Sequence, residues 1–208
     1  MVVVVTAADR NFFQMLSVML RSVRAHVDPA KVDVRVIDLG LDADQRAALS
    51  DVVGAFIQVD WDIVFPFTDR LPEYKKAFTL SPFLPKYLPD AETIVWIDAD
   101  AWVQTDQAVA TLVAGAQAAD LAIAPQIHPC YPDAVSRGKV RTFGFPPLTG
   151  RARRISSWLR TQLGRRYSRA LANRVLFKPT YNAGVFAARA DSPVWAAWER
   201  AYRTARIR

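Results

Sequence analysis

The chain has 208 residues, a length that suits one domain able to bury most of its apolar surface. Hydrophobic residues at 51% and aromatic residues at 11% exclude a disordered chain and indicate a substantial core. Cys130 is the single cysteine, which excludes an internal disulfide framework, leaves too few soft ligands for a structural zinc site and favours a reducing, cytoplasmic location. No run of 18 apolar residues is present, so the sequence predicts no membrane-spanning helix.

Strands and helices alternate through the first part of the chain. The hydrophobic patterns predict strands over residues 2–6, 32–37 and 55–59, and helices over residues 12–26 and from Asp42 onward. The second helix opens on a capping box, because Gln45 stands three residues after Asp42. Since parallel strands need crossover connections, this order predicts an α/β fold with a mostly parallel central sheet flanked by helices.

The remaining elements continue this alternation, with one basic interruption. The patterns predict a helix near Glu73–Leu80, strands over residues 93–97, 120–124 and 181–188, and helices over residues 108–118 and 192–208. Residues 127–180 hold 12 of the 27 Lys and Arg residues and a single acid, Asp133. We therefore predict one domain over residues 1–208 with a basic helical insert at about residues 130–178.

The insert contains a basic amphipathic stretch from Arg151 to Arg174, which includes Trp158 and Tyr167. Such a helix can lie peripherally on an anionic membrane surface. Alternatively, it packs on the sheet and directs its arginines into solvent. The formal net charge of +7 also suggests a third class of protein, a nucleic-acid-binding module. We disfavour that class because the charge is confined to one segment and no nucleic-acid-binding motif accompanies it.

An acidic pair, Asp98-Ala99-Asp100, directly follows the strongly apolar strand predicted over residues 93–97. Two carboxylates at the exit of a buried strand are costly unless a cation neutralises them. At strand spacing, side chains at i and i+2 point the same way, so both can reach one hard cation, which can in turn hold a diphosphate. Because ligands of α/β sheets bind at the carboxyl ends of strands, the pattern predicts chemistry on a phosphorylated substrate, in particular a nucleotide-sugar.

Two further aspartate pairs have different interpretations. Asp42-Ala43-Asp44 begins a helix and is not expected to bind a metal. Asp60-Trp61-Asp62 follows a strand, and a solvated loop is favoured there over a ligand role.

Small and polar residues mark three more candidate segments, each with an ordinary structural alternative. After the first strand, Asp9 and Asn11 either contact a base, with the carboxylate accepting the imide N–H of uracil, or cap the following helix. Asn182-Ala183-Gly184 either contacts the hydroxyls of a sugar or forms a turn before an edge strand. The pair Lys75-Lys76 either neutralises a leaving diphosphate or is a solvated surface pair.

Taken in order, the segments Thr6–Asn11, Asp33–Leu49, Lys76–Val103 and Tyr181–Ala187 resemble glycosyltransferase family 8, which belongs to the GT-A superfamily. This resemblance implies a GT-A-like, Rossmann-related fold. It implies nucleotide contacts from Ala8, Asp9, Asn11, Asp98, Ala99 and Asp100. By position it also implies a divalent metal, Mn²⁺ or Mg²⁺, on Asp98 and Asp100, and contacts to the donor sugar or phosphate from Lys76, Asn182 and Ala183.

The family further implies transfer of a hexose from a nucleotide-sugar, in particular a UDP-sugar, to a glycan or lipid-linked acceptor with retention of configuration. Members of the family continue with an Asp-Gln pair on a helix and a later histidine that supplies a third metal ligand. Neither is matched within the 208 residues, and neither His26 nor His128 has the right position. A degenerate or shortened GT-A fold that binds the donor without turnover is therefore the alternative. A haloacid-dehalogenase-type phosphatase is disfavoured because Trp102 stands where that family has Thr or Val.

Overall fold

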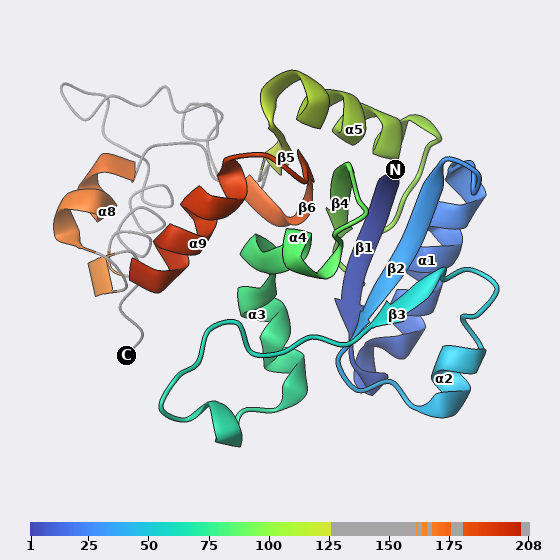
Figure 1. Cartoon of the computed structure of the whole chain (residues 1–208), viewed down its shortest axis with the longest axis horizontal. Coiled ribbons are helices and arrows are strands. Elements are labelled where there is room, and N and C mark those ends of the chain that lie inside the picture. Colours follow the sequence, from blue (N-terminus) through green and yellow to red (C-terminus); the bar gives the residue numbers. More distant parts are fainter. Residues whose placement is uncertain (126–160, 162–163, 166–167, 176–180, 205–208) are drawn as a thin grey trace, which may run out of the picture. The chain divides into compact units, whose positions relative to one another are not determined.

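The computed structural model describes residues 1–125, 161, 164–165, 168–175 and 181–204 (Figure 1). Its centre is a six-stranded sheet with the strand order β3-β2-β1-β4-β6-β5. The strands are β1 (Val2–Ala8), β2 (Val32–Asp38), β3 (Ala55–Ile57), β4 (Thr93–Ile97), β5 (Leu121–Pro125) and β6 (Tyr181–Arg189). β1 pairs in parallel with both β2 and β4, and β2 pairs in parallel with β3. The predicted mostly parallel sheet is confirmed, with β6 added antiparallel to β4.

Helices connect and cover these strands. The α-helices are α1 (Phe13–His26), α2 (Ala43–Ala47), α3 (Ala77–Leu80), α4 (Leu84–Tyr87), α5 (Gln107–Ala119), α8 (Arg169–Val175) and α9 (Val194–Thr204). Single 3₁₀ turns are η1 (Arg10–Phe12), η2 (Thr68–Arg70), η3 (Glu73–Lys76) and η4 (Ser81–Phe83). The helix predicted near Glu73–Leu80 is thus a 3₁₀ turn followed by one α-helical turn. It lies between Pro72 and Pro82, and Ser81, which precedes the second proline, keeps helical backbone angles and begins η4.

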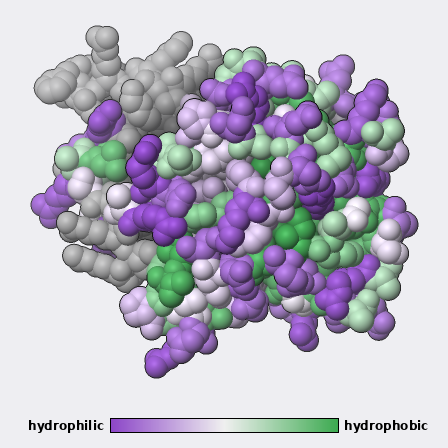
Figure 2. All heavy atoms as spheres, viewed as in Figure 1, coloured by the Kyte–Doolittle hydropathy of each residue, from purple (hydrophilic) through white to green (hydrophobic). Residues whose placement is uncertain are grey.

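Side chains that alternate along the strands form two cores, one on each face of the sheet. In β1, Val4 and Ala8 belong to one core, and Val3 and Val5 belong to the other. Side chains of α1 and α5 complete the first core, whereas α3, α4 and the first half of α9 supply the second. Polar residues cover most of the surface visible in Figure 2, and hydrophobic residues reach it in small groups. The sheet with helices on both faces confirms the predicted α/β class.

The strand directions bring several chain segments to one edge of the sheet. β1, β2 and β4 run in parallel, so their carboxyl ends meet there, and Ala8 is paired with Asp38. β6 runs the other way, so its amino-terminal end reaches the same edge, where Val185 is paired with Ile97. β4 lies between β1 and β6 in the strand order, so the acidic turn that follows it stands near the middle of this edge.

The chain divides into two compact units. One comprises Met1–Ile123 with Ala183–Arg200, and the other comprises Ala124–Asn182 with Ala201–Arg208. The predicted basic insert falls in the second unit and lies largely outside the described residues, as do His128, Cys130 and most of the basic amphipathic stretch. The single-domain boundary therefore stays a prediction. Across the described residues, none of the helices combines the length and apolarity that a membrane span requires.

Candidate active site

The acidic pair forms a turn and does not continue the strand. β4 ends at Ile97, and the amide of Ala101 donates to the carbonyl oxygen of Asp98 at 2.9 Å. Asp98 is half-buried and Asp100 is exposed. The alternation of an extended strand therefore does not bring the two carboxylates together, as the sequence argument assumed. Both residues instead belong to one turn.

The charge of Asp100 acts on Asp98 across this turn. Burial raises the pKa of Asp98, the hydrogen bond from Trp96 opposes this, and the negative charge of Asp100 raises the pKa further. A divalent cation between the carboxylates would remove this repulsion, and carboxylate oxygens are the ligands that Mn²⁺ and Mg²⁺ accept. Within the described residues, no group of three or more His, Cys, Asp or Glu side chains could hold a metal ion. Among the described residues, a cation at this turn would therefore find at most two such ligands, Asp98 and Asp100.

The start of β6 lies beside this turn. The amide of Asp98 donates to the carbonyl oxygen of Gly184 at 2.7 Å, which continues the β4–β6 pairing by one residue. Gly184 is buried, whereas Asn182 and Ala183 are exposed at the beginning of the strand. β6 lies between β4 and β5, so the alternative of a turn before an edge strand is wrong. Two segments that are 86 positions apart in sequence, at residues 98 and 184, thus share one hydrogen bond.

Asp9 caps the 3₁₀ turn that follows β1. Its Oδ1 accepts hydrogen bonds from the amides of Asn11 at 3.0 Å and Phe12 at 3.2 Å, and its Oδ2 accepts one from Nδ2 of Asn11 at 3.0 Å. The capping alternative is therefore confirmed. It leaves the nucleotide role of Asp9 open, because a carboxylate has about four acceptor positions and three are occupied here.

The capping box predicted for α2 is present and reaches the same loop. Oδ1 of Asp42 accepts from the amide of Gln45 at 2.8 Å, and Oε1 of Gln45 accepts from the amide of Asp42 at 3.2 Å. Nε2 of Gln45 then donates to the carbonyl oxygen of Arg10 at 3.1 Å. One glutamine side chain thus closes a helix end and fastens the loop that contains Asp9.

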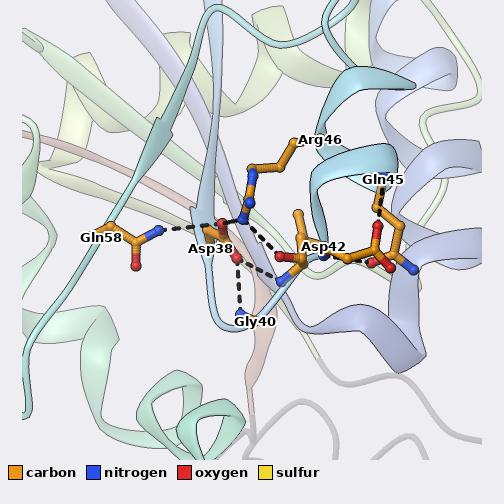
Figure 3. A network of polar contacts seen from close by, with 7 residues as sticks. Asp38, Gly40, Asp42, Gln45, Arg46 and Gln58 are labelled. Atoms are coloured by element: carbon orange, nitrogen blue, oxygen red, sulfur yellow. Dashed lines mark hydrogen bonds and ion pairs between the residues drawn. The ribbon is translucent and has the colours of Figure 1, made fainter.

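A buried carboxylate at the end of β2 organises the neighbouring loops (Figure 3). The side chain of Asp38 is 2% exposed. Its Oδ1 accepts from the amides of Gly40 at 2.9 Å and Leu41 at 2.7 Å, and its Oδ2 accepts from Arg46 at 2.8 Å and Gln58 at 3.3 Å. Burial raises the pKa of Asp38, but these hydrogen bonds and the guanidinium outweigh it and leave the pKa below its ordinary value. The sequence analysis missed this hub, although an aspartate two residues before a glycine at a strand end is a turn signal.

Two interpretations that assumed solvated side chains are wrong. The side chain of Lys76 is 11% exposed, because Nζ donates to the carbonyl oxygen of Val59 at 2.8 Å and pairs with Glu73. The side chain of Asp62 is 7% exposed and accepts from Lys86 at 2.7 Å and from the hydroxyl of Tyr87 at 2.8 Å. Both side chains find partners on segments distant in sequence, and these partners replace water. No local pattern predicts such contacts.

A family model for glycosyl transferase family 8 matches residues 3–112, which is more than half of the chain. The chain belongs to glycosyltransferase family 8. This confirms the resemblance inferred from the first strand and the acidic pair, whereas the Asn-Ala-Gly-Val segment at residues 182–185 lies outside the matched residues. The matched residues include the loop at Asp9, the hub at Asp38 and the acidic turn. No curated protein matches the sequence at a significant level.

Solved glycosyltransferases share the fold of this family 8 chain at low sequence identity. The galactosyltransferase LgtC, solved with donor and acceptor sugar analogues, has a TM-score of 0.56 at 16% identity over 97% of this chain and 61% of LgtC. The bifunctional glycosyltransferase WbbM has a TM-score of 0.62 at 16% identity over 99% of this chain and 35% of WbbM. The glucosyl-3-phosphoglycerate synthase of Mycobacterium tuberculosis was solved with Mn²⁺, UDP and glucosyl-3-phosphoglycerate. It has a TM-score of 0.50 at 16% identity over 91% of this chain and 57% of the synthase. The likeness shows the GT-A fold, and the chain spans between 35% and 61% of these neighbours.

Proposed function

We propose that this family 8 chain is a metal-dependent glycosyltransferase that moves a hexose from a UDP-sugar to a glycan or lipid-linked acceptor with retention of configuration. It would act in the cytoplasm, with peripheral contact to the inner face of the membrane through the basic segment. The observation that carries the proposal is the junction of the acidic turn with β6 through Asp98 and Gly184. It sets two carboxylates and the small residues of β6 at the edge where α/β sheets bind ligands. The Mycobacterium tuberculosis neighbour, with Mn²⁺ and UDP, supports the donor class.

The two carboxylates would hold the metal together with the diphosphate. Asp98 and Asp100 offer hard oxygen ligands, and Mn²⁺ or Mg²⁺ bound there would neutralise the diphosphate and stabilise the departing UDP. The described residues offer no third His, Cys, Asp or Glu ligand at this turn, so diphosphate oxygens would supply further ligands. Metal and nucleotide should therefore bind together. Ala99, which stands between the two acids in sequence, is buried.

The remaining contacts would come from the loop after β1 and from β6. Ala8, whose side chain is buried, would contact the nucleotide through its backbone, and Asp9 would accept the imide N–H of uracil while its Oδ1 still caps η1. Asn11, whose amide now contacts Asp9, would turn to the nucleotide. Asn182 and Ala183 would line the donor sugar. Lys76 would have to leave Glu73 to reach a phosphate or sugar oxygen.

A thermal-shift measurement with UDP and Mn²⁺ tests the binding part of this proposal. Both ligands together, at about 100 times the dissociation constant, should raise the melting temperature of the wild type by roughly 5–10 °C. Asp98→Asn or Asp100→Asn should abolish the shift. Asp44→Asn is the matched control, because Asp42-Ala43-Asp44 has the same three letters but begins α2, and this variant should keep the full shift. A wild type whose melting ignores UDP with Mn²⁺ would refute the proposal.

A second function, donor binding without turnover, is favoured by the small protein ligand set. Release of UDP from UDP-glucose and UDP-galactose separates the two functions. Turnover should appear in the wild type and vanish in Asp100→Asn. Binding of UDP with Mn²⁺ but no release of UDP, with or without added glycan acceptors, would favour the binding protein.

A further inference from the structure

The indole of Trp96 fixes one oxygen of the acidic turn. Trp96 is the fourth residue of β4 and is 4% exposed. Its Nε1 donates to Oδ1 of Asp98 at 2.7 Å, from the same face of the chain two residues earlier. An indole N–H can only donate, so this hydrogen bond has a single direction and Oδ1 must be the acceptor.

Aromatic packing holds the indole in place. The ring of Trp96 stacks on Phe186 of β6, with centroids 6.4 Å apart and an interplanar angle of 16°. Phe186 in turn meets the edges of Trp195 and Trp198 of α9, with centroids 6.2 Å and 5.3 Å away. Packed aromatic rings have few alternative positions in a dense core. The indole N–H of Trp96 is therefore already directed at Asp98 before any ligand binds.

Asp98 is consequently fixed at three atoms. Its amide donates to Gly184, its carbonyl oxygen accepts from Ala101, and its Oδ1 accepts from Trp96. Within the described part of the chain, Oδ2 is the atom of this carboxylate that accepts no hydrogen bond. It is the oxygen left for a cation.

We propose that Trp96 is a positioning residue of the metal site, which orients Asp98 so that Oδ2 faces the cation held with the diphosphate. This inference rests on the proposed function, because it assigns a partner to one of the two metal ligands. Hydrogen-bond donors behind metal ligands fix the orientation of the ligand, and their loss weakens metal affinity by roughly 10- to 100-fold.

The test compares two buried tryptophans of the same aromatic cluster. Trp195 is 6% exposed and its Nε1 also donates at 2.7 Å, but to the carbonyl oxygen of Arg189. Mn²⁺ is titrated into protein with saturating UDP, and bound Mn²⁺ is followed by the loss of the free-ion electron paramagnetic resonance signal. Trp96→Phe should raise the half-saturating Mn²⁺ concentration about tenfold or more. Trp195→Phe should leave it within about twofold of the wild type, although both variants lose a buried hydrogen bond.

A second variant keeps the test decisive if Trp96→Phe folds poorly. Trp96→His retains a ring N–H at the place of the indole donor but removes the fused six-membered ring, so it should lose stability and keep most of the Mn²⁺ affinity. An unchanged Mn²⁺ titration in Trp96→Phe, an equal weakening in Trp195→Phe, or an equal weakening in Trp96→His would each overturn the inference. A wild type without Mn²⁺-dependent UDP binding would instead refute the proposed function itself.

Discussion

Replacement of Asp38 by asparagine should destabilise the protein without touching the acidic turn. Asn can keep the two bonds to Gly40 and Leu41 through its oxygen, but its amide nitrogen would face two donors, Arg46 and Gln58. One lost bond is charge-assisted, worth about 1.5–3 kcal/mol, and the longer one is worth about 0.5–1 kcal/mol. Arg46 is 40% exposed and can turn to water, which reduces the cost. We expect a loss of about 2–3 kcal/mol at neutral pH.

Urea unfolding followed by circular dichroism measures this loss, and a second aspartate supplies the control. Asp42→Asn should be nearly neutral, because asparagine caps a helix about as well as aspartate. The effect of Asp38→Asn should also depend on pH. Because the pKa of Asp38 is lowered by folding, its carboxylate stabilises the protein above the ordinary pKa, and this stability is lost as the pH falls through the lowered value. The difference in the free energy of unfolding between wild type and Asp38→Asn should therefore disappear in strong acid. A difference that stays constant with pH, or equals that of Asp42→Asn, would refute the reasoning.

Three further substitutions test the supports around the site. Gln45→Glu keeps the capping-box oxygen but cannot donate to the carbonyl oxygen of Arg10. The affinity for UDP, measured by calorimetry, should therefore fall about threefold to tenfold, while the urea midpoint of unfolding stays the same. An unchanged affinity for UDP would contradict this. Gly54→Ala should cost about 1–3 kcal/mol in urea unfolding, because the new Cβ would lie 2.2 Å from Oδ1 of Asp33. Ser22→Ala should cost about 1–3 kcal/mol by the same measurement, since its hydroxyl is the partner of a buried backbone amide after the acidic turn, and an unchanged midpoint would show that water replaces it.

The elements that the sequence predicted well are those with local signals. β4 begins and ends as predicted, because Thr93 and the four apolar residues after it are bounded by Glu92 and Asp98. The capping box of α2 follows from two residues three positions apart. β3 is shorter than predicted and ends at Ile57, where Gln58 turns its side chain to Asp38. That contact joins two strands, so the pattern of residues 55–59 does not contain it.

The candidate site shows the same division. The acidic pair was visible because two carboxylates after a buried strand are conspicuous in any single sequence. The partners that hold it were not visible, since Gly184 and the ring of Phe186 come from a strand far along the chain. Lys76 was misjudged for the same reason, because its acceptor at Val59 is 17 residues away. Predictions from local spacing therefore find candidate ligands such as Asp98 and Asp100 and miss the contacts that orient them.

The antiparallel pairing of β4 with β6 holds the two ends of the chain segment that connects these strands. Five residue pairs and the bond from Asp98 to Gly184 fasten the two ends of the intervening polypeptide. Doubling the length of a connecting segment whose ends are fixed adds only about 0.6 kcal/mol to the entropic cost of closing the loop. A change in the length of the chain between these two strands therefore costs little free energy, while the pairing itself keeps Asp98 beside Gly184.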